Sequence, residues 1–427
     1  DVCAIAEANR RFAVVYRENI TSTNKNPGFA GFFVLDRLWF NGARHSPMVC
    51  NMRIRNSISL YFSGLVVAVL WAVLQPAHAD TGFRAWIQNF RGEAISQGVT
   101  GSVYDDAFRG VTEPDLLVLE KANYQPEFKA EVWEYLDSRV QERAITNGQV
   151  MLQQYAKELA SIEKSSGVDR HVLLAIWSME SNYGAVLQDK TKLHYIPRAL
   201  ATLAYADPKR AKFARTQLIA ALKILQRGDV EQAELLGSWA GAMGHTQFIP
   251  TSYIAYAVDF DGDGKSDIWH SVPDALATAA QLLKKNGWRS GESWGYEILP
   301  SNKGSGEELL ALQADKGPVF ALQKNFFVVK RYNNADKYAL AVLLLSDRIA
   351  GKPAPIKDWT RPYTPLDMTE KEELQRLLAA HGFYSGVVDG LIGGESREAI
   401  KRFQASKNVE QTGYASKEVL QQLRGKN

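Results

Sequence analysis

The sequence predicts a mainly α-helical protein made of a large domain and a small C-terminal domain. Apolar residues recur at helical spacing from residue 81 to about residue 350, with Gly and Pro between the helical stretches. Four prolines follow within residues 351–366, and this composition predicts a stiff, extended linker. A chain of 427 residues is long enough for two or three domains. We therefore expect helical domains over residues 80–350 and 367–427.

Three stretches carry the helical prediction for the large domain. Residues 131–167 form a long amphipathic stretch that ends at a glycine. A second helix follows the N-cap candidate Ser271 and stops at Gly287. Residues 337–351 are apolar on most faces, which predicts a buried helix.

The composition excludes some classes of function. A hydrophobic fraction of 46% and a charged fraction of 23% are ordinary for a globular protein. The formal net charge of +3 is too small to indicate nucleic-acid binding. The two cysteines, Cys3 and Cys50, both precede a predicted signal peptide. The mature protein would then contain no cysteine, which excludes disulfides and thiol chemistry.

The N-terminal region predicts export. Met52 opens a basic segment, an apolar run follows from Ile58 to Leu74, and Ala77-His-Ala79 matches a small-x-small cleavage site. This order predicts a signal peptide over residues 52–79, cleavage after Ala79, and a periplasmic protein. Residues 1–51 show no clean periodicity, and we interpret them as an upstream extension outside the mature protein. An uncleaved membrane anchor is the alternative, because the apolar run is close to spanning length.

One predicted helix carries a carboxyl group on its apolar face. Residues 168–184 have Asp169 as an N-cap candidate and Gly184 as a stop. Glu180 follows Ile176 by four residues and Trp177 by three, so it lies on the apolar side. Burial raises the pKa of a carboxyl above its usual value of about 4.3, as a general acid for glycosidic bonds requires. A buried structural glutamate, satisfied by an arginine or by backbone groups, is the alternative.

Two motifs carry a resemblance to a known family. The segment WSMESNYG at residues 177–184 and the segment GSWAGAMGHTQFIPTSYIAYAVDFDGDGKSDIW at residues 237–269 resemble the membrane-bound lytic murein transglycosylase B family. The resemblance covers roughly residues 82–350 and implies a lysozyme-like helical catalytic domain. It implies Glu180 as the catalytic residue. It also implies substrate-cleft residues at four positions, where hydroxyl, amide and aromatic groups suit a sugar: Ser238, Gln247, Tyr332 and Asn333.

The activity that this resemblance implies is lytic cleavage of peptidoglycan. Glu180 would protonate the oxygen between N-acetylmuramic acid (MurNAc) and N-acetylglucosamine (GlcNAc), and then accept a proton from the muramic 6-hydroxyl. The product would be a 1,6-anhydro sugar, and no cofactor would be required. The glycan strand is the expected partner, with cell-wall synthesis or hydrolysis complexes as candidate protein partners. A hydrolytic muramidase and a non-catalytic wall-binding protein are the alternatives.

An aspartate-rich loop follows the second motif. Asp259, Asp261 and Asp263 occupy positions 1, 3 and 5 of an EF-hand-like loop, with a glycine at position 6. Lys265 would offer its carbonyl at position 7, and Asp267 stands at position 9. His270 replaces the usual acid at position 12. The pattern predicts a weak structural Ca²⁺ site, and a self-capped Asp/Gly-rich turn is the alternative.

The last 60 residues resemble a small peptidoglycan-binding module. The match covers residues 374–423, with Asp389-Gly390 suited to a tight turn and Ser396 suited to a helix N-cap. We expect three short helices around one core. The resemblance implies wall binding, which would raise the local enzyme concentration by tethering.

Overall fold

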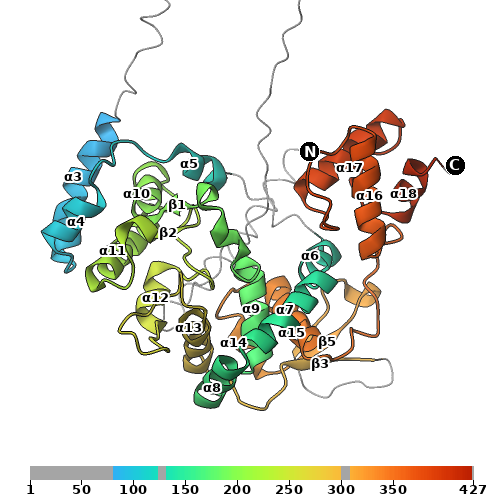
Figure 1. The fold of residues 1–427 in the computed structure, drawn as a ribbon, viewed down its shortest axis with the longest axis horizontal. Helices are drawn as coiled ribbons and strands as arrows, with labels where there is room; N and C mark the ends of the chain where they lie inside the picture. The colour runs from blue at the N-terminus through green and yellow to red at the C-terminus, as the bar shows by residue number, and fades with distance from the viewer. Residues whose placement is uncertain (1–79, 124–130, 300–307, 426–427) are drawn as a thin grey trace, which may run out of the picture.

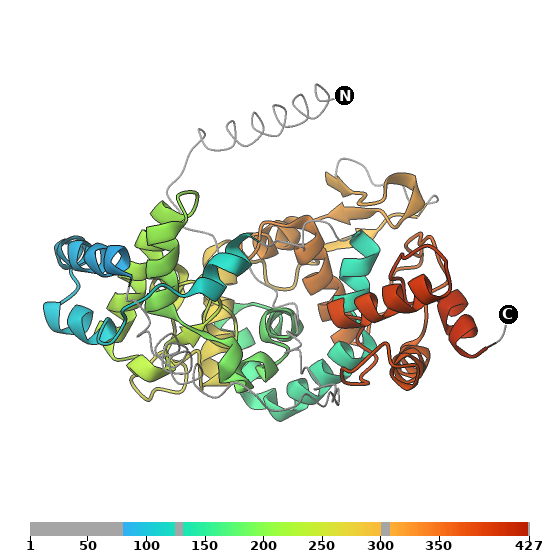
Figure 2. The same ribbon diagram turned by 90° about the horizontal axis from the view of Figure 1, so that it is seen from above.

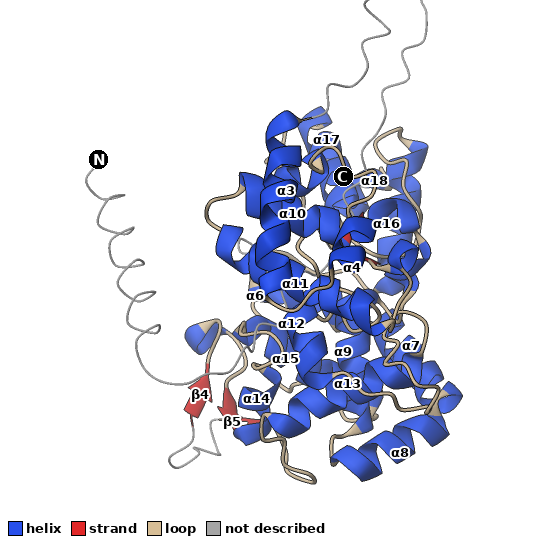
Figure 3. Cartoon of the chain, turned by 90° about the vertical axis from the view of Figure 1, so that its left-hand side faces the viewer, coloured by secondary structure: helices blue, strands red, loops and turns tan. Residues whose placement is uncertain are grey.

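The computed structural model describes residues 80–123, 131–299 and 308–425. The predicted upstream extension and signal peptide lie outside these residues. The described chain is mainly helical, as Figures 1 and 3 show, which confirms the predicted fold class. In that part of the chain, no helix is both long and apolar enough to cross a membrane.

A large helical body comes first in the chain and ends near residue 350. Its α-helices are α3 (Thr81–Ser96), α4 (Gly101–Ala107), α5 (Leu116–Asn123), α6 (Val132–Arg139), α7 (Glu142–Gln154), α8 (Ala156–Ser166), α9 (Arg170–Ser181), α10 (Ile196–Ala206), α11 (Ala211–Arg227), α12 (Pro250–Tyr256), α13 (Val272–Lys285), α14 (Lys324–Val329) and α15 (Asp336–Ile349). In Figure 1, α3 and α4 lie at one end of the molecule and the C-terminal helices lie at the other.

Two small antiparallel sheets connect these helices. Strand β1 (His194–Tyr195) pairs with β2 (Leu236–Gly237), with His194 opposite Gly237. Strands β3 (Gly295–Glu297), β5 (Phe320–Leu322) and β4 (Glu308–Leu310) form a three-stranded sheet in that order. Short 3₁₀ turns occupy Ala185–Gln188, Lys190–Lys192, Gln232–Glu234 and Ala314–Lys316.

Helix α9 is the centre of the large body. Its N-cap is Asp169, whose carboxylate accepts a hydrogen bond from the His171 amide, as predicted. It packs against α7, α8, α13 and α15, and it is buried along most of its length rather than on one face. The helix ends before the predicted stop, because Asn182 already adopts a left-handed conformation with a φ of 50°. Tyr183 and Gly184 also have positive φ angles, so the chain turns sharply after Ser181.

The stretch 131–167 forms three helices rather than one. Helix α6 ends before an extended residue, Gln141, and α7 ends at Tyr155, whose φ is −109°. The breaks let α6, α7 and α8 wrap around α9 and α15, which a single straight helix could not do. Helix α8 ends at Gly167 in a left-handed conformation, as predicted.

A separate helical body follows residue 366. Helices α16 (Met368–Ala380), α17 (Gly394–Ser406) and α18 (Lys417–Leu423) surround their own small core, to which all three contribute apolar side chains. The predicted tight turn is confirmed, because Gly390 has a φ of 69° and the Asp389 carboxylate accepts from the Leu391 amide at 3.0 Å.

The prediction of Ser396 as an N-cap is wrong. The N-cap of helix α17 is Gly393, three residues before Ser396. The Ser396 hydroxyl is buried and lies 3.3 Å from Nε2 of Gln375, a buried side chain that also binds the turn at Gly390. The serine therefore joins α17 to α16 instead of capping α17.

The Pro-rich segment 351–366 contains no helix or strand but is held against the large body. The Thr360 amide donates to Oε1 of Gln313 at 2.9 Å, and the Thr360 carbonyl accepts from the same side chain at 2.8 Å. The Glu297 carboxylate accepts from the amides of Ile356 and Lys357 at 2.6 and 2.8 Å. The segment is therefore a fixed strap rather than a free spacer.

The C-terminal body docks on α6, as Figures 1 and 2 show. Two nitrogens of Arg361 donate to the Asp137 carboxylate at 2.6 and 3.0 Å, and Arg397 pairs with Glu134. The Trp133 ring packs edge-on against two tyrosine rings, Tyr363 and Tyr414, with centroids at 5.4 and 5.6 Å. The bidentate pair of Arg361 in the strap, the Arg397–Glu134 pair and the ring packing together hold the two bodies in one orientation.

Candidate active site

Helix α9 carries the Glu180 carboxyl into the protein interior. The residue is 3% exposed, in agreement with its predicted place on the apolar side of the helix. Its Oε1 accepts a hydrogen bond of 2.5 Å from the hydroxyl of Tyr338, which lies on α15. The neighbouring turn of α9 contributes Ile176 and Trp177, both fully buried.

Burial controls the protonation of Glu180. Removal from water raises the pKa of this carboxyl to about 8, while the Tyr338 hydrogen bond and the positive charge of Arg139 oppose the rise. The side chain is therefore mostly protonated near neutral pH. A protonated carboxyl held this way can donate a proton to a leaving oxygen.

The sequence prediction missed Tyr338. This side chain is buried, and its ring stacks on that of Tyr332 with centroids 6.5 Å apart. Its hydroxyl donates the hydrogen bond to Glu180. If α15 carried only apolar side chains, this hydrogen bond would be absent. The available signal was a tyrosine at the start of an otherwise apolar buried helix, since a buried tyrosine usually has a hydrogen-bond partner.

We expect Tyr338→Phe to change the pH dependence of catalysis. The hydroxyl stabilises the carboxylate form of Glu180, so its removal raises the pKa of Glu180 further and moves the alkaline limb of the kcat–pH profile to higher pH. We also expect kcat to fall roughly tenfold, the equivalent of one hydrogen bond to a charged group. Kinetics from pH 5 to 10 check this. Tyr195→Phe, which removes a hydroxyl bonded to the Ala107 carbonyl, should leave the profile unchanged.

Ser238 and Gln247 lie in one tight loop that follows β2. The Ser238 hydroxyl accepts from the Ala242 amide at 2.9 Å and so fixes the loop. Gln247 has a φ of 50°, and its Nε2 donates to the Gly244 carbonyl at 2.9 Å. Its Oε1 is buried and has no hydrogen-bond partner among the described residues. An acceptor left open in this way is suited to an N–H group of a ligand.

Tyr332 and Asn333 lie between α14 and α15. Tyr332 is fully buried, donates a hydrogen bond to the Thr246 carbonyl and packs edge-on against Phe248. It therefore supports the loop that carries Gln247. The Asn333 Oδ1 accepts from the Ala335 amide at 3.1 Å, close to the start of α15.

His245 joins this loop to α9. Its Nδ1 accepts from the Trp177 indole at 3.1 Å, and its carbonyl accepts from the Ser181 hydroxyl at 2.6 Å. Burial lowers the pKa of His245 to about 4, so the ring is neutral at physiological pH. A Cβ on Gly184 would lie 2.5 Å from the His245 ring, so only glycine fits at position 184. The loop and the glutamate helix are thus one rigid unit.

A cavity of about 1260 Å³ opens beside this unit. Ser178 and Asn182, two residues before and after Glu180, line it. Its large-body wall includes Lys121, His194 and Trp239. The C-terminal body closes another side with residues that include Ile392 and Tyr414. No pattern in the sequence predicted that both bodies share one cavity.

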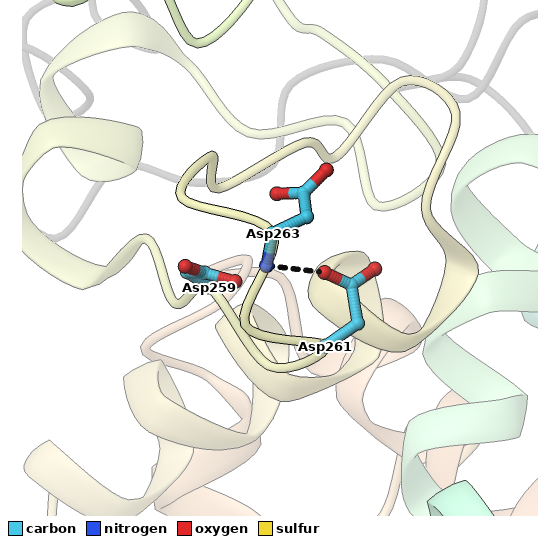
Figure 4. A group of neighbouring side chains, drawn as sticks. All are labelled: Asp259, Asp261 and Asp263. Atoms are coloured by element: carbon cyan, nitrogen blue, oxygen red, sulfur yellow. Dashed lines mark hydrogen bonds between the residues drawn. The ribbon is translucent and has the colours of Figure 1, made fainter.

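The aspartate loop lies after α12. Figure 4 shows Asp259, Asp261 and Asp263 side by side, and one carboxylate oxygen from each lies within 4.8 Å of the other two. Asp267 is not part of this group: it accepts from the amides of Trp269 and His270 and pairs with the His270 ring at 2.9 Å. The loop is anchored from inside by the buried Asp274.

Comparison with known proteins agrees with this geometry. A family model described as "Transglycosylase SLT domain" matches residues 82–306 and 299–347, and one described as "Putative peptidoglycan binding domain" matches residues 369–423. The membrane-bound lytic murein transglycosylase B of Escherichia coli (strain K12) is 31% identical over 235 residues. That match covers 48% of this chain and 64% of the E. coli protein, just under two thirds of it.

Two solved structures are similar over most of their own length. SltB3 from Pseudomonas aeruginosa, in complex with NAG-anhNAM-pentapeptide, is 40% identical with a TM-score of 0.62, and the match covers 80% of this chain and 99% of that one. The lytic transglycosylase Slt35 of Escherichia coli, in complex with calcium, is 25% identical with a TM-score of 0.54, covering 64% and 94%. The chain therefore belongs to the transglycosylase family with an SLT domain that includes lytic murein transglycosylase B, as its two motifs predicted.

Proposed function

We propose that this protein is a peptidoglycan lytic transglycosylase that cleaves the β-1,4 bond between MurNAc and GlcNAc. The observation that carries the proposal is the buried Glu180, with a pKa raised to about 8 and a hydrogen bond from Tyr338. Membership of the family supports the same activity. The two relatives named above as lytic transglycosylases, together with the anhydro fragment bound to SltB3, support the type of product.

Glu180 acts in both steps of the proposed reaction. It first donates its proton to the glycosidic oxygen, which releases the GlcNAc-bearing leaving group. The MurNAc N-acetyl oxygen assists at the anomeric carbon, as in other substrate-assisted glycosidases. The Glu180 carboxylate, stabilised by Tyr338, then accepts the proton of the muramic 6-hydroxyl as this oxygen closes the 1,6-anhydro ring. We further propose that Ser238, Gln247, Tyr332 and Asn333 shape the cleft, and that no cofactor takes part.

A hydrolytic muramidase is the competing enzyme. The two-carboxylate scheme needs a second acid across the bond. Asp189 is the nearest downstream candidate, but its carboxylate is held by Lys192 at 2.7 Å and by the Thr191 hydroxyl at 2.5 Å. Digestion of purified sacculi followed by mass spectrometry distinguishes the two reactions. We expect 1,6-anhydro ends, 18 mass units lighter than hydrolysed ends by the loss of one water, and reducing ends would overturn the proposal.

The domain bounds, cellular location and partners that we propose follow from the sequence predictions. We propose residues 80–350 as the catalytic domain, residues 351–366 as its connecting strap, and residues 367–427 as a wall-binding domain. Cleavage of the signal peptide 52–79 would deliver the enzyme to the periplasm without residues 1–51. Its partners would be glycan strands, and complexes of wall synthesis or hydrolysis are candidates.

A weak structural Ca²⁺ site in the aspartate loop is a further part of the proposal. Two oxygens bound to one Ca²⁺ at about 2.4 Å are separated by at most about 4.8 Å, and the three carboxylates meet this limit. Asp259, Asp261 and Asp263 would hold the ion, with the Lys265 carbonyl as a fourth donor. The ion would offset two of the three exposed negative charges and fix the loop next to the His245 segment. The Slt35 structure with calcium supports this choice of ion.

Calcium should stabilise the protein measurably. With a Kd of about 10⁻⁴–10⁻³ M, 10 mM CaCl₂ adds about 1.4–2.7 kcal/mol, which raises Tm by a few °C relative to EDTA. Asp263→Asn should remove most of this rise while it keeps an oxygen for the Lys265 amide. Mg²⁺, which binds such loops poorly, is the matched control. An unchanged Tm with Ca²⁺ would identify the loop as a self-capped turn.

A further inference from the structure

Arg139 is a cation on the cavity wall that has no counterion among the described residues. It is the last residue of α6, and its guanidinium lies 5.8 Å from the centroid of the Tyr135 ring. Its Nε is buried and has no hydrogen-bond partner among the described residues. The same side chain lines the cavity, and its positive charge lowers the pKa of the Glu180 carboxyl.

The other arginines that line this cavity all have partners. Arg361 and Arg397 form ion pairs with acids of α6, and Arg143 approaches Asp389 at 4.0 Å. Arg198 donates to two backbone carbonyls at 2.9 and 3.0 Å. Arg139 forms no such pair within the described chain. A cation at the end of a helix is favourable by up to about 1 kcal/mol. An unpaired buried N–H costs about 1–3 kcal/mol, so helix stabilisation alone does not explain this arrangement.

The chemistry of the missing partner follows from the donor. A guanidinium pairs best with an acceptor-only oxygen, such as a carboxylate or a carbonyl. GlcNAc offers hydroxyls and an N-acetyl group, and MurNAc offers these as well. MurNAc adds a 3-O-lactyl group, which ends in a free carboxylate on a bare strand and in an amide carbonyl where a stem peptide is attached. This group distinguishes the two sugars.

We propose that Arg139 binds the lactyl-derived oxygen of the MurNAc unit whose bond is cleaved, and so selects muramyl over glucosaminyl units at that position. This inference rests on the proposed function for the identity of the substrate. The charge of Arg139 acts on the Glu180 carboxyl, and α6 packs against α15, the helix that carries Tyr338, so we place the contact at the sugar nearest Glu180. A bound carboxylate would also offset the positive charge of Arg139, which opposes protonation of Glu180. Binding of the correct sugar would therefore keep Glu180 protonated.

Binding measurements test the proposal without turnover. Isothermal titration calorimetry on the full chain with Glu180→Gln would use three tetrasaccharides: chitotetraose, a GlcNAc–MurNAc tetrasaccharide with free lactyl groups, and the same sugar with stem peptides. We expect added Arg139→Gln to weaken both muramyl ligands about tenfold or more and to change chitotetraose less than twofold. Arg139→Lys should recover binding of the free carboxylate, which needs charge, better than binding of the amide carbonyl.

Arg143→Gln is the matched control, because it removes the same charge from the same wall. It should leave all three affinities within twofold of the parent. An equal loss for chitotetraose in Arg139→Gln, or an equal loss of muramyl binding in Arg143→Gln, would overturn the proposal. Unfolding midpoints confirm folding, and Arg139→Lys provides the readout where Arg139→Gln does not fold. Analysis of the products of the wild-type enzyme tests the proposed reaction and does not depend on these binding measurements. A failure of the proposed function can therefore be distinguished from a failure of the Arg139 proposal.

Discussion

Glu180→Gln is expected to lower the rate of glycan cleavage by about 10²–10⁴-fold with the fold intact. Glutamine has nearly the same shape and can still accept the Tyr338 hydrogen bond, but it cannot transfer a proton. The decrease in turbidity of sacculi at equal enzyme concentrations measures the rate. A variant that clears sacculi at the wild-type rate would remove Glu180 from the chemistry and support a non-catalytic wall-binding protein.

The same substitution should make the protein more stable. Folding raises the pKa of Glu180 from its ordinary value of 4.5 to about 8, so between these values the folded state keeps a proton that the unfolded state releases. The free energy of unfolding of the wild type therefore falls as pH rises from about 4.5 to about 8, whereas glutamine has no such dependence. We expect the variant to gain a few kcal/mol at pH 8 and little at pH 4.5. Urea unfolding at both pH values checks this, and an equal gain at both would contradict it.

Trp177→Ala is expected to destabilise the catalytic domain by about 3–5 kcal/mol. The indole is fully buried and packs edge-on against Tyr155, Tyr183 and His245, with centroids at 5.7, 5.4 and 5.5 Å. Its removal leaves a cavity one turn before Glu180 and an unpaired Nδ1 on His245. A Tm lower by roughly 10 °C should follow, measured by calorimetry.

Trp177→Phe separates packing from hydrogen bonding. Phenylalanine keeps most of the ring contacts but cannot donate to His245. We expect it to cost about 1–2 kcal/mol, the penalty of one buried unsatisfied acceptor together with a smaller ring. Equal losses for Phe and Ala would show that the indole N–H, and not the packed volume, supports the helix.

Local patterns predicted the parts of the site that are close in sequence. The spacing of Ile176, Trp177 and Glu180 was sufficient to predict a buried carboxyl, because helix periodicity fixes which residues share a face. The three clustered aspartates were predicted for the same reason, since a short loop brings alternate side chains together. Asp267 was also predicted as a ligand, but its oxygens bond within its own turn at His270.

The sequence patterns could not predict contacts between segments that are far apart in the chain. Tyr338 and Glu180 are 158 positions apart, and only the packing of α15 on α9 brings them together. The break at Gln141 was missed because tertiary packing, rather than a proline or glycine, ends α6 there. The role of Ser396 was mistaken because the hydroxyl of a buried serine can bond to a neighbouring helix as well as cap its own.

The docked C-terminal body changes how wall attachment would assist cleavage. A flexible linker would let the enzyme sample many bonds around one anchoring point. Here the strap at Thr360 and the Arg361–Asp137 pair hold the binding domain at a set distance and angle from Glu180. The point at which the last three helices attach to the sacculus would then determine which bond the protein cuts. The cleaved bond would lie at a constant distance from the attachment point.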